Sequence, residues 1–203
     1  MLNKTARSWL FAIASMLAVC GVSVAADKPN VVILATGGTI AGAGADVTNS
    51  ATYQAAKVPV DKLIAGIPQL NAIASVRGEQ VFQIASESLT NANLVTLAKR
   101  VAALVKQNDV DGVVITHGTD RLQFTGERLV ERLGERPAKP VVLTGAMRPY
   151  ELRTTDALQN LTEALLAVQL VAPGVYVAMH NQVLRFPGVV KDVERLRFTQ
   201  REA

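Results

Sequence analysis

Five short apolar runs recur along the chain, and longer polar or amphipathic stretches separate them. The runs are rich in Val and Ile and occupy residues 31–36, 80–85, 112–116, 141–144 and 174–179. Continuous β-branched runs of this length are typical of strands that are buried on both faces of a parallel sheet. We therefore expect each run to form a strand of one sheet.

Two of the intervening stretches have the period of an amphipathic helix. Thr90 or Asn91 can cap the first, and Thr155 or Asp156 can cap the second. The first helix would bury Leu94, Leu97, Ala98, Val101, Leu104 and Val105, and the second would bury Leu158, Leu161, Leu165 and Val168. Alternation of strands and helices predicts an α/β fold: an open, mostly parallel sheet with helices on both faces and right-handed crossovers.

One stretch directly after the first run does not fit this alternation. Residues 42–57 are rich in Gly, Ala, Asn, Ser and Thr and contain Tyr53. Ligands of open α/β sheets bind at the carboxyl ends of the strands. We therefore interpret this stretch as a mobile loop that could act as a lid.

The N-terminus has the pattern of a secretory signal peptide. Lys4 and Arg7 precede an apolar run at residues 9–24, and small residues precede the polar Asp27. The run is short for a membrane anchor. We expect a signal peptide at residues 1–26, cleavage near Ala25 or Ala26, a periplasmic or secreted domain at 27–203, and no stable membrane association.

A lipoprotein is the alternative for this leader. Leu17-Ala18-Val19-Cys20 resembles a lipobox, although Val19 is bulky for the position before the cysteine. Cys20 is the only cysteine, so cleavage of the leader would leave no disulfide and no thiolate metal ligand.

Composition narrows the classes of partner. Removing Lys4 and Arg7 with the leader lowers the formal net charge from +4 to +2, which implies no acidic partner. Aromatic residues make up only 4% of the chain, so stacking of nucleic-acid bases has little support and we expect no nucleic-acid partner. His117 and His180 are the only histidines. We therefore expect no metal site and no cofactor.

Hydroxyl side chains follow three of the predicted strands. Thr39 follows Gly37 and Gly38, which permit a tight turn; the alternatives are a phosphate-binding loop or a plain turn. Thr119 and Asp120 follow Gly118; the alternative is a helix N-cap. The second run, residues 80–85, ends at Ala85 and continues into Ser86-Glu87-Ser88, where Ser86 could donate to a carboxylate and Glu87 could accept from an amine.

A threonine hydroxyl needs a nearby base before it can act as a nucleophile. Because histidine is scarce, Lys191 or Tyr53 would have to supply that base. A desolvated lysine can be neutral and basic, although most lysines are solvated surface charges.

The chain resembles the bacterial asparaginases. Two stretches, residues 36–42 (TGGTIAG) and 116–120 (THGTD), are similar to the two signature motifs of that family. Residues 78–80, 86–88 and 145–149 (GAMRP) also match, and the motifs occur in the family's order. The likeness as far as Asp120 is to secreted type II glutaminase-asparaginases.

The resemblance implies a role for each of the candidate site residues. Thr39 is similar to the primary nucleophile and Tyr53 to the lid tyrosine that orients or deprotonates it. Thr119, Asp120 and Lys191 resemble a second catalytic group in which the lysine activates the threonine. Asp120 also resembles a ligand of the substrate α-amino group, and Ser86 that of the α-carboxylate. Glu87 is similar to the residue of dual-specificity members. The reaction would be hydrolysis of L-asparagine, and also of L-glutamine, through a threonyl ester, in a homo-oligomer.

The chain also departs from the family pattern. Arg121 replaces the usual threonine, and residues 150–160 are more similar to short asparaginase-like proteins. Arg185-Phe186-Pro187 replace the familiar Asp-Gly-Arg ahead of Lys191. Full-length members carry a C-terminal domain that we expect to be absent here. Two alternatives remain: an amino-acid-binding or degenerate domain with little turnover, and a nucleotide-binding sheet, which lacks the glycine fingerprint.

Overall fold

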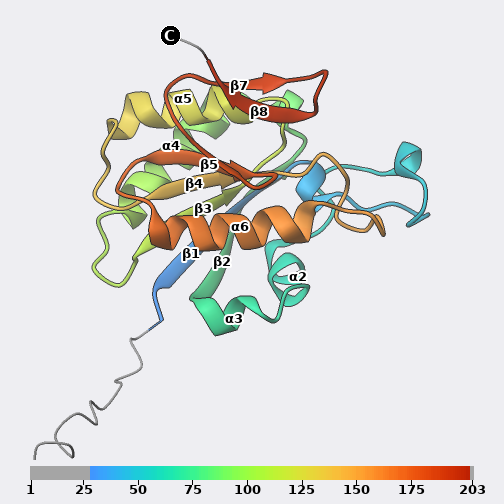
Figure 1. Cartoon of the computed structure of the whole chain (residues 1–203), viewed down its shortest axis with the longest axis horizontal. Coiled ribbons are helices and arrows are strands. Elements are labelled where there is room, and N and C mark those ends of the chain that lie inside the picture. The colour runs from blue at the N-terminus through green and yellow to red at the C-terminus, as the bar shows by residue number, and fades with distance from the viewer. Residues whose placement is uncertain (1–27, 202–203) are drawn as a thin grey trace, which may run out of the picture.

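A six-stranded sheet forms the centre of the protein. The computed structural model describes residues 28–201, so the expected signal peptide lies outside the described residues. The sheet has the strand order β2-β1-β3-β4-β5-β6, and only β6 runs antiparallel to its neighbour (Figure 1). Its strands are β1 Asn30–Gly37, β2 Ser75–Ile84, β3 Gly112–Thr116, β4 Val141–Thr144, β5 Val175–Met179 and β6 Gln182–Arg185.

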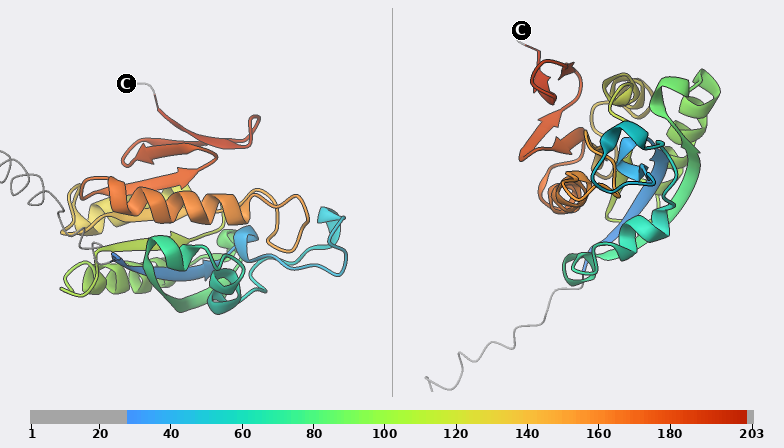
Figure 2. Two further views of the ribbon diagram at one scale, coloured as in Figure 1. Left: turned by 60° about the horizontal axis from the view of Figure 1, so that its bottom comes forward. Right: turned by 90° about the vertical axis from the view of Figure 1, so that its right-hand side faces the viewer.

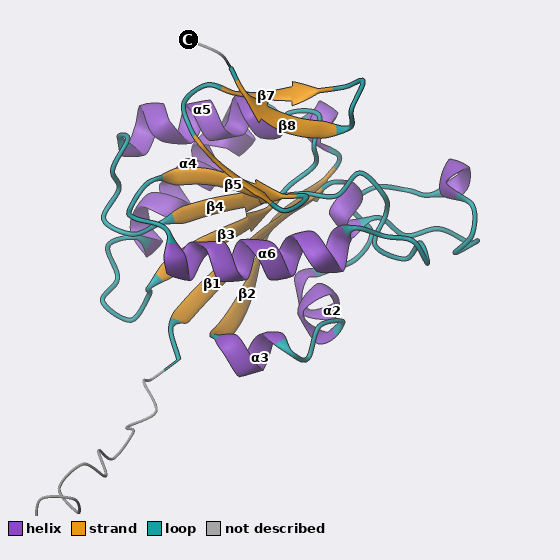
Figure 3. Ribbon diagram, in the orientation of Figure 1, coloured by secondary structure: helices purple, strands orange, loops and turns teal. Residues whose placement is uncertain are grey.

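Helices cover both faces of this sheet (Figure 3), which confirms the predicted α/β fold. One face packs on α4 and α5 through Leu97, Val101 and Leu129. The other packs on α2, α3 and α6 through Val60, Leu70 and Leu165. The helices are α2 Val60–Ala65, α3 Leu70–Ile73, α4 Asn91–Leu104, α5 Leu122–Leu133 and α6 Ala157–Leu170.

A separate two-stranded hairpin follows the sheet. Its strands, β7 Val189–Asp192 and β8 Arg197–Gln200, pair with each other and not with the main sheet. The hairpin lies outside that sheet (Figure 2). Val189 and Phe198 attach it to the core on the side of α4 and α5.

The predicted elements agree with the structure most closely at the centre of the sheet. β3 and β4 match two of the apolar runs residue for residue. Thr90 caps α4, and its side chain and that of Asn93 form a capping box. β2 begins five residues before the predicted run. It lies at the edge of the sheet, so its first residues are exposed or half-exposed and several are polar, and they do not form the apolar run that indicates a buried strand.

Some expectations about helices were wrong or incomplete. Leu158 was expected to be buried, but it is 37% exposed because it lies on the outer side of α6. α2 and α3 have six and four residues, too few for a period to show. The pattern of apolar positions also gave no sign of α5, β6, β7 or β8. Within residues 28–201, no helix has the length and apolar character needed to cross a bilayer.

The strand order reverses next to β1. The chain leaves β1 for α2 and α3 on one face and reaches β2 on one side, whereas it leaves β3 for α5 on the other face and continues towards β4. Such a switch point opens a crevice at the carboxyl ends of the two strands, where ligands of open α/β sheets bind. The loops that begin at Gly38 and at His117 lie at this point.

Candidate active site

Two glycines turn the chain sharply at the end of β1. Gly37 and Gly38 have φ angles of 101° and 78°. Such positive angles favour glycine, because it has no Cβ atom to clash with the backbone. A Cβ on Gly38 would collide with the backbone of Gly118. The turn leads into a short 3-10 helix, η2 Thr39–Ala41. The loops that carry Thr39 and Thr119 are therefore in backbone contact.

The loop after Thr39 forms a long arm that returns to it. Residues 42–57 extend from the body at the right of Figure 1 and carry a 3-10 helix, η3 Ser50–Thr52. Ala43 and Gln54 pair across the base of the arm. Tyr53 follows η3, and its hydroxyl lies 3.2 Å from Thr39 Oγ1. The structure thus brings together Thr39 and Tyr53, which the family resemblance pairs.

A second group of side chains meets at the end of β3. Lys191 Nζ donates to Thr119 Oγ1 over 3.0 Å and to Asp120 Oδ1 over 2.7 Å. The Thr119 and Lys191 side chains are largely buried, whereas that of Asp120 is 64% exposed. The alternative role as a helix cap is wrong, because α5 begins at Leu122 with Arg121 in the capping position and no side-chain cap.

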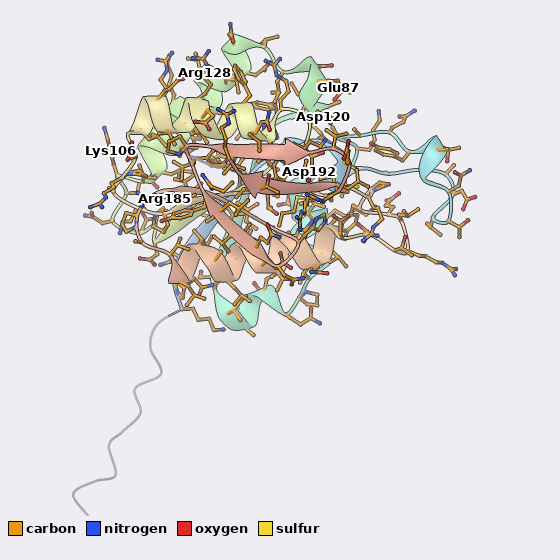
Figure 4. All side chains as sticks on the ribbon, turned by 45° about the horizontal axis from the view of Figure 1, so that its top comes forward. Glu87, Lys106, Asp120, Arg128, Arg185 and Asp192 are labelled. Carbon is orange, nitrogen blue, oxygen red and sulfur yellow. The ribbon has the colours of Figure 1, made fainter. Side chains whose placement is uncertain are left out.

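The turn after β2 lies against this group. Ser86 is buried in η4 Ser86–Ser88, and a Cβ on Gly118 would lie 2.5 Å from its Oγ. Glu87 is exposed and lies at the same end of the molecule as Asp120 (Figure 4). Arg121 Nη1 donates to the Leu89 carbonyl over 2.9 Å. The unusual arginine thus ties the Thr119 loop to the Ser86 turn.

Asp156, which the sequence offers as a possible helix cap, is a buried carboxylate near the site. Asp156 makes no capping bond; instead it accepts from the backbone N–H groups of Met147 and Arg148 at 3.0 and 2.9 Å. Asn160 Nδ2 and His180 Nε2 also donate to it, over 3.0 and 2.7 Å. Burial acts to raise the pKa of Asp156, but these donors, Met147 foremost, together hold the pKa below its ordinary value. In the sequence, the only indication of this network is an Asp and an Asn four residues apart at the start of α6.

This network fixes the segment that begins at Gly145 and borders both threonine loops. A Cβ on Gly145 would lie 3.0 Å from Thr119 Cγ2, and one on Gly42 would lie 2.8 Å from Pro149 Cβ. Glu151 donates its N–H to the Gly42 carbonyl over 3.2 Å. The 145–151 segment therefore contacts the Thr119 loop and the base of the arm.

His117, the residue before Gly118, is fully buried. Its Nδ1 lies 2.7 Å from the Gly118 carbonyl and its Nε2 3.0 Å from Thr125 Oγ1. A carbonyl can only accept, so Nδ1 carries the proton and Nε2 accepts from the hydroxyl. Burial, above all, lowers the pKa of His117 to about 4. The imidazole is therefore neutral at pH 7 and connects α5 to the Thr119 loop.

We expect His117 to make the stability of the fold depend on pH. Its pKa is about 4 in the folded protein against 6.5 for the free side chain, so the unfolded chain binds a proton first. The contribution of His117 to the free energy of unfolding is complete above pH 6.5. It is lost as the pH drops towards 4, and the loss is on the order of 3 kcal/mol. Urea unfolding at pH 7 and 4.5 measures this loss. His117→Gln should flatten the dependence, and an equal loss in both proteins would contradict the assignment.

Comparisons with known proteins agree with this geometry. Residues 30–194 match the family model described as "Asparaginase, N-terminal". The chain is 56% identical to a glutaminase-asparaginase of Pseudomonas aeruginosa over 158 residues, which cover 76% of this chain and 43% of that protein. It is 43% identical to a probable periplasmic L-asparaginase of Haemophilus influenzae, covering 86% of this chain and 52% of that one.

A solved structure is also similar. The probable cytoplasmic L-asparaginase of Campylobacter jejuni superposes with a TM-score of 0.78 at 38% identity, over 85% of this chain and 54% of the other. The chain thus spans about half the length of the relatives it matches. With the family model covering most of its length and the two threonine loops meeting at the switch point of the sheet, the chain belongs to the asparaginase family and matches its N-terminal domain.

Proposed function

We propose that this chain is an amidohydrolase of linear amides that converts L-asparagine, and also L-glutamine, to the acid and ammonia. One observation carries the proposal: Lys191 Nζ lies within hydrogen-bonding distance of both Thr119 and Asp120, and the loop that holds these two residues touches the loop of Thr39. The relatives named glutaminase-asparaginase and L-asparaginase support the choice of substrates.

The proposed reaction proceeds through an ester on Thr39. The Thr39 hydroxyl attacks the side-chain amide carbon while its proton passes to the oxygen of Tyr53, 3.2 Å away, and the Tyr53 hydroxyl releases its own proton towards the leaving nitrogen. The C–N bond then breaks, and the nitrogen takes a proton and leaves as ammonia. Water attacks the ester carbon, the acid is released, and the Thr39 hydroxyl is restored.

The remaining site residues have supporting roles in this proposal. Ser86 donates to the α-carboxylate, and Glu87 and Asp120 accept from the α-amino group. Lys191 activates Thr119; in the observed arrangement its Nζ donates to the hydroxyl, so it must release a proton to act as a base. Asp120, 2.7 Å from Nζ, is next to that proton.

An amino-acid-binding domain with little turnover is the second candidate. The 64% exposure of Asp120 favours it, because an open site holds substrate less firmly and screens charges more strongly. Ammonia release from the purified protein with asparagine, glutamine and buffer alone separates the two. Turnover of either amide supports the amidohydrolase, and binding without ammonia release supports the second candidate.

We also propose export to the periplasm. The names of the relatives include both a periplasmic and a cytoplasmic protein, so family membership does not decide the compartment, and the proposal depends on the pattern of residues 1–26. The mass of the protein recovered from the periplasm should correspond to an N-terminus at Ala26 or Asp27. An intact Met1 or a lipid on Cys20 would contradict it.

We further propose that the chain self-associates. Several large apolar side chains of α6 and β6 are exposed, among them Leu166 at 43%, Leu170 at 82% and Val183 at 47%. Leu166 and Leu170 are one turn apart on α6, and adjoining exposed apolar side chains are common in protein interfaces. Light scattering of the sample used for the ammonia assay measures the oligomeric state, and a strictly monomeric protein would exclude it.

A further inference from the structure

The position of Lys191 is not explained by the main sheet. Lys191 lies in β7, which pairs only with β8. Hydrogen bonds of the six-stranded sheet therefore do not fix its distance from Thr119, which follows β3 in that sheet. Another element must hold β7 in place, and the contacts point to α5.

Three residues on one face of α5 contact the segment from Phe186 to Lys191. A side chain on Gly126 would collide with the Phe186 ring, which is 1% exposed. Glu127 Oε1 accepts from the Gly188 N–H over 2.7 Å. Gln123 Oε1 accepts from the Lys191 N–H over 2.5 Å. We call Gln123, Gly126 and Glu127 the α5 seat; their spacing of three and four places them on one side of the helix.

The same helix also fixes Thr119. α5 begins at Leu122, two residues after Asp120, and Thr125 in its second turn bonds the buried His117 of the Thr119 loop. One rigid element thus determines the positions of both atoms of the 3.0 Å contact between Lys191 and Thr119.

We propose that Gln123 is a positioning residue, which holds the backbone of Lys191 at the α5 seat so that its amine meets Thr119. The catalytic readout of this proposal rests on the proposed function; the seat itself does not. Phe186 completes the seat, because its ring occupies the space left free above Gly126.

Gln123→Met tests the proposal, because methionine has similar length but no acceptor oxygen. A neutral hydrogen bond contributes little to overall stability, so the variant should fold and melt within a few degrees of the parent. Small misplacement of a catalytic group can reduce the rate about a hundredfold. We expect kcat to fall about 10- to 100-fold with KM changed less than about threefold. Gln123→Glu keeps an acceptor and should recover most of kcat.

Gln169→Met is the matched control, because Gln169 lies on α6 and its side chain donates to the Leu165 carbonyl within the same helix. It should leave both constants unchanged. Glu127→Met provides a second variant at the seat, and it should reduce kcat in the same way. If Gln123→Met retains kcat within about twofold, or loses no more than Gln169→Met, the proposal is wrong.

A second readout does not need catalysis. In protein labelled with 15N-lysine, the amide of Lys191 should exchange faster and shift upfield in Gln123→Met, and Lys191→Met identifies its signal. A parent protein without amidase activity would refute the proposed function, while this signal would still test the seat. An unchanged Lys191 amide would overturn the seat even in an active enzyme.

Discussion

Replacing Thr39 by alanine should reduce amide hydrolysis at least about a thousandfold, the largest loss expected of any single substitution in this chain. The variant lacks the hydroxyl that forms the acyl ester, and loss of a nucleophile typically costs three or more orders of magnitude. Thr39 is half-buried and its side chain bonds Tyr53, so the thermal melt should change little. Ammonia release and calorimetry on the same sample measure both.

Two further variants sharpen this prediction. Thr39→Ser keeps a hydroxyl and should retain part of the activity. Thr96→Ala removes an exposed hydroxyl on α4, away from both threonine loops, and should behave as the parent. Substantial activity in Thr39→Ala would mean that the ester forms elsewhere, with Thr119 the next candidate.

Lys191→Met should produce the second largest loss, of about 100- to 10,000-fold in kcat. Methionine preserves much of the side-chain volume but removes the amine that contacts Thr119 and Asp120, and a positioned base contributes this much to typical proton transfers. KM should change less, because the proposed substrate ligands remain. Initial rates across asparagine concentrations separate the two constants.

The matched control is Lys106→Met. Lys106 is exposed and lies far from Asp120 in Figure 4. A solvated lysine should not influence turnover, so this variant should keep the parent's kcat. Equal losses in the two variants would show that the chain responds to net charge and not to the amine beside Thr119.

The fold was predictable from sequence where burial is complete. β1, β3 and β4 are buried on both faces, so their composition is uniform and their positions could be predicted to within a residue. Edge strands and short helices have weaker signals, because solvent accepts polar side chains on them. α5 was missed because two of its four buried residues, Thr125 and Gly126, are not large apolar residues, which weakens the helical pattern of apolar positions.

The sequence indicates the candidate site residues but not the elements that hold them in place. Thr39, Thr119 and Asp120 follow strands within recognisable motifs, so their proximity could be predicted from parallel strands that end at one edge. Lys191 is 71 residues from Asp120, and no sequence pattern links β7 to α5. Gln123 accepts from the backbone N–H of Lys191, 68 residues away, and Asp156 accepts from the nearby backbone N–H groups of Met147 and Arg148. The sequence does not indicate such backbone partners.

The reversal of strand order beside β1 also divides the site between the two layers of helices. Thr39 and Tyr53 belong to the chain that continues into α2 and α3, whereas Thr119 and Lys191 are anchored to α5 on the opposite face. Each pair is therefore attached to its own layer of helices, and the two loops meet at the backbone contact of Gly38 with Gly118, beyond the paired strands β1 and β3. A small sliding of one layer past the other would change the separation of the two hydroxyl groups while leaving both pairs intact. The alignment of the two hydroxyl groups and the hydrogen bonding within each pair can therefore vary independently.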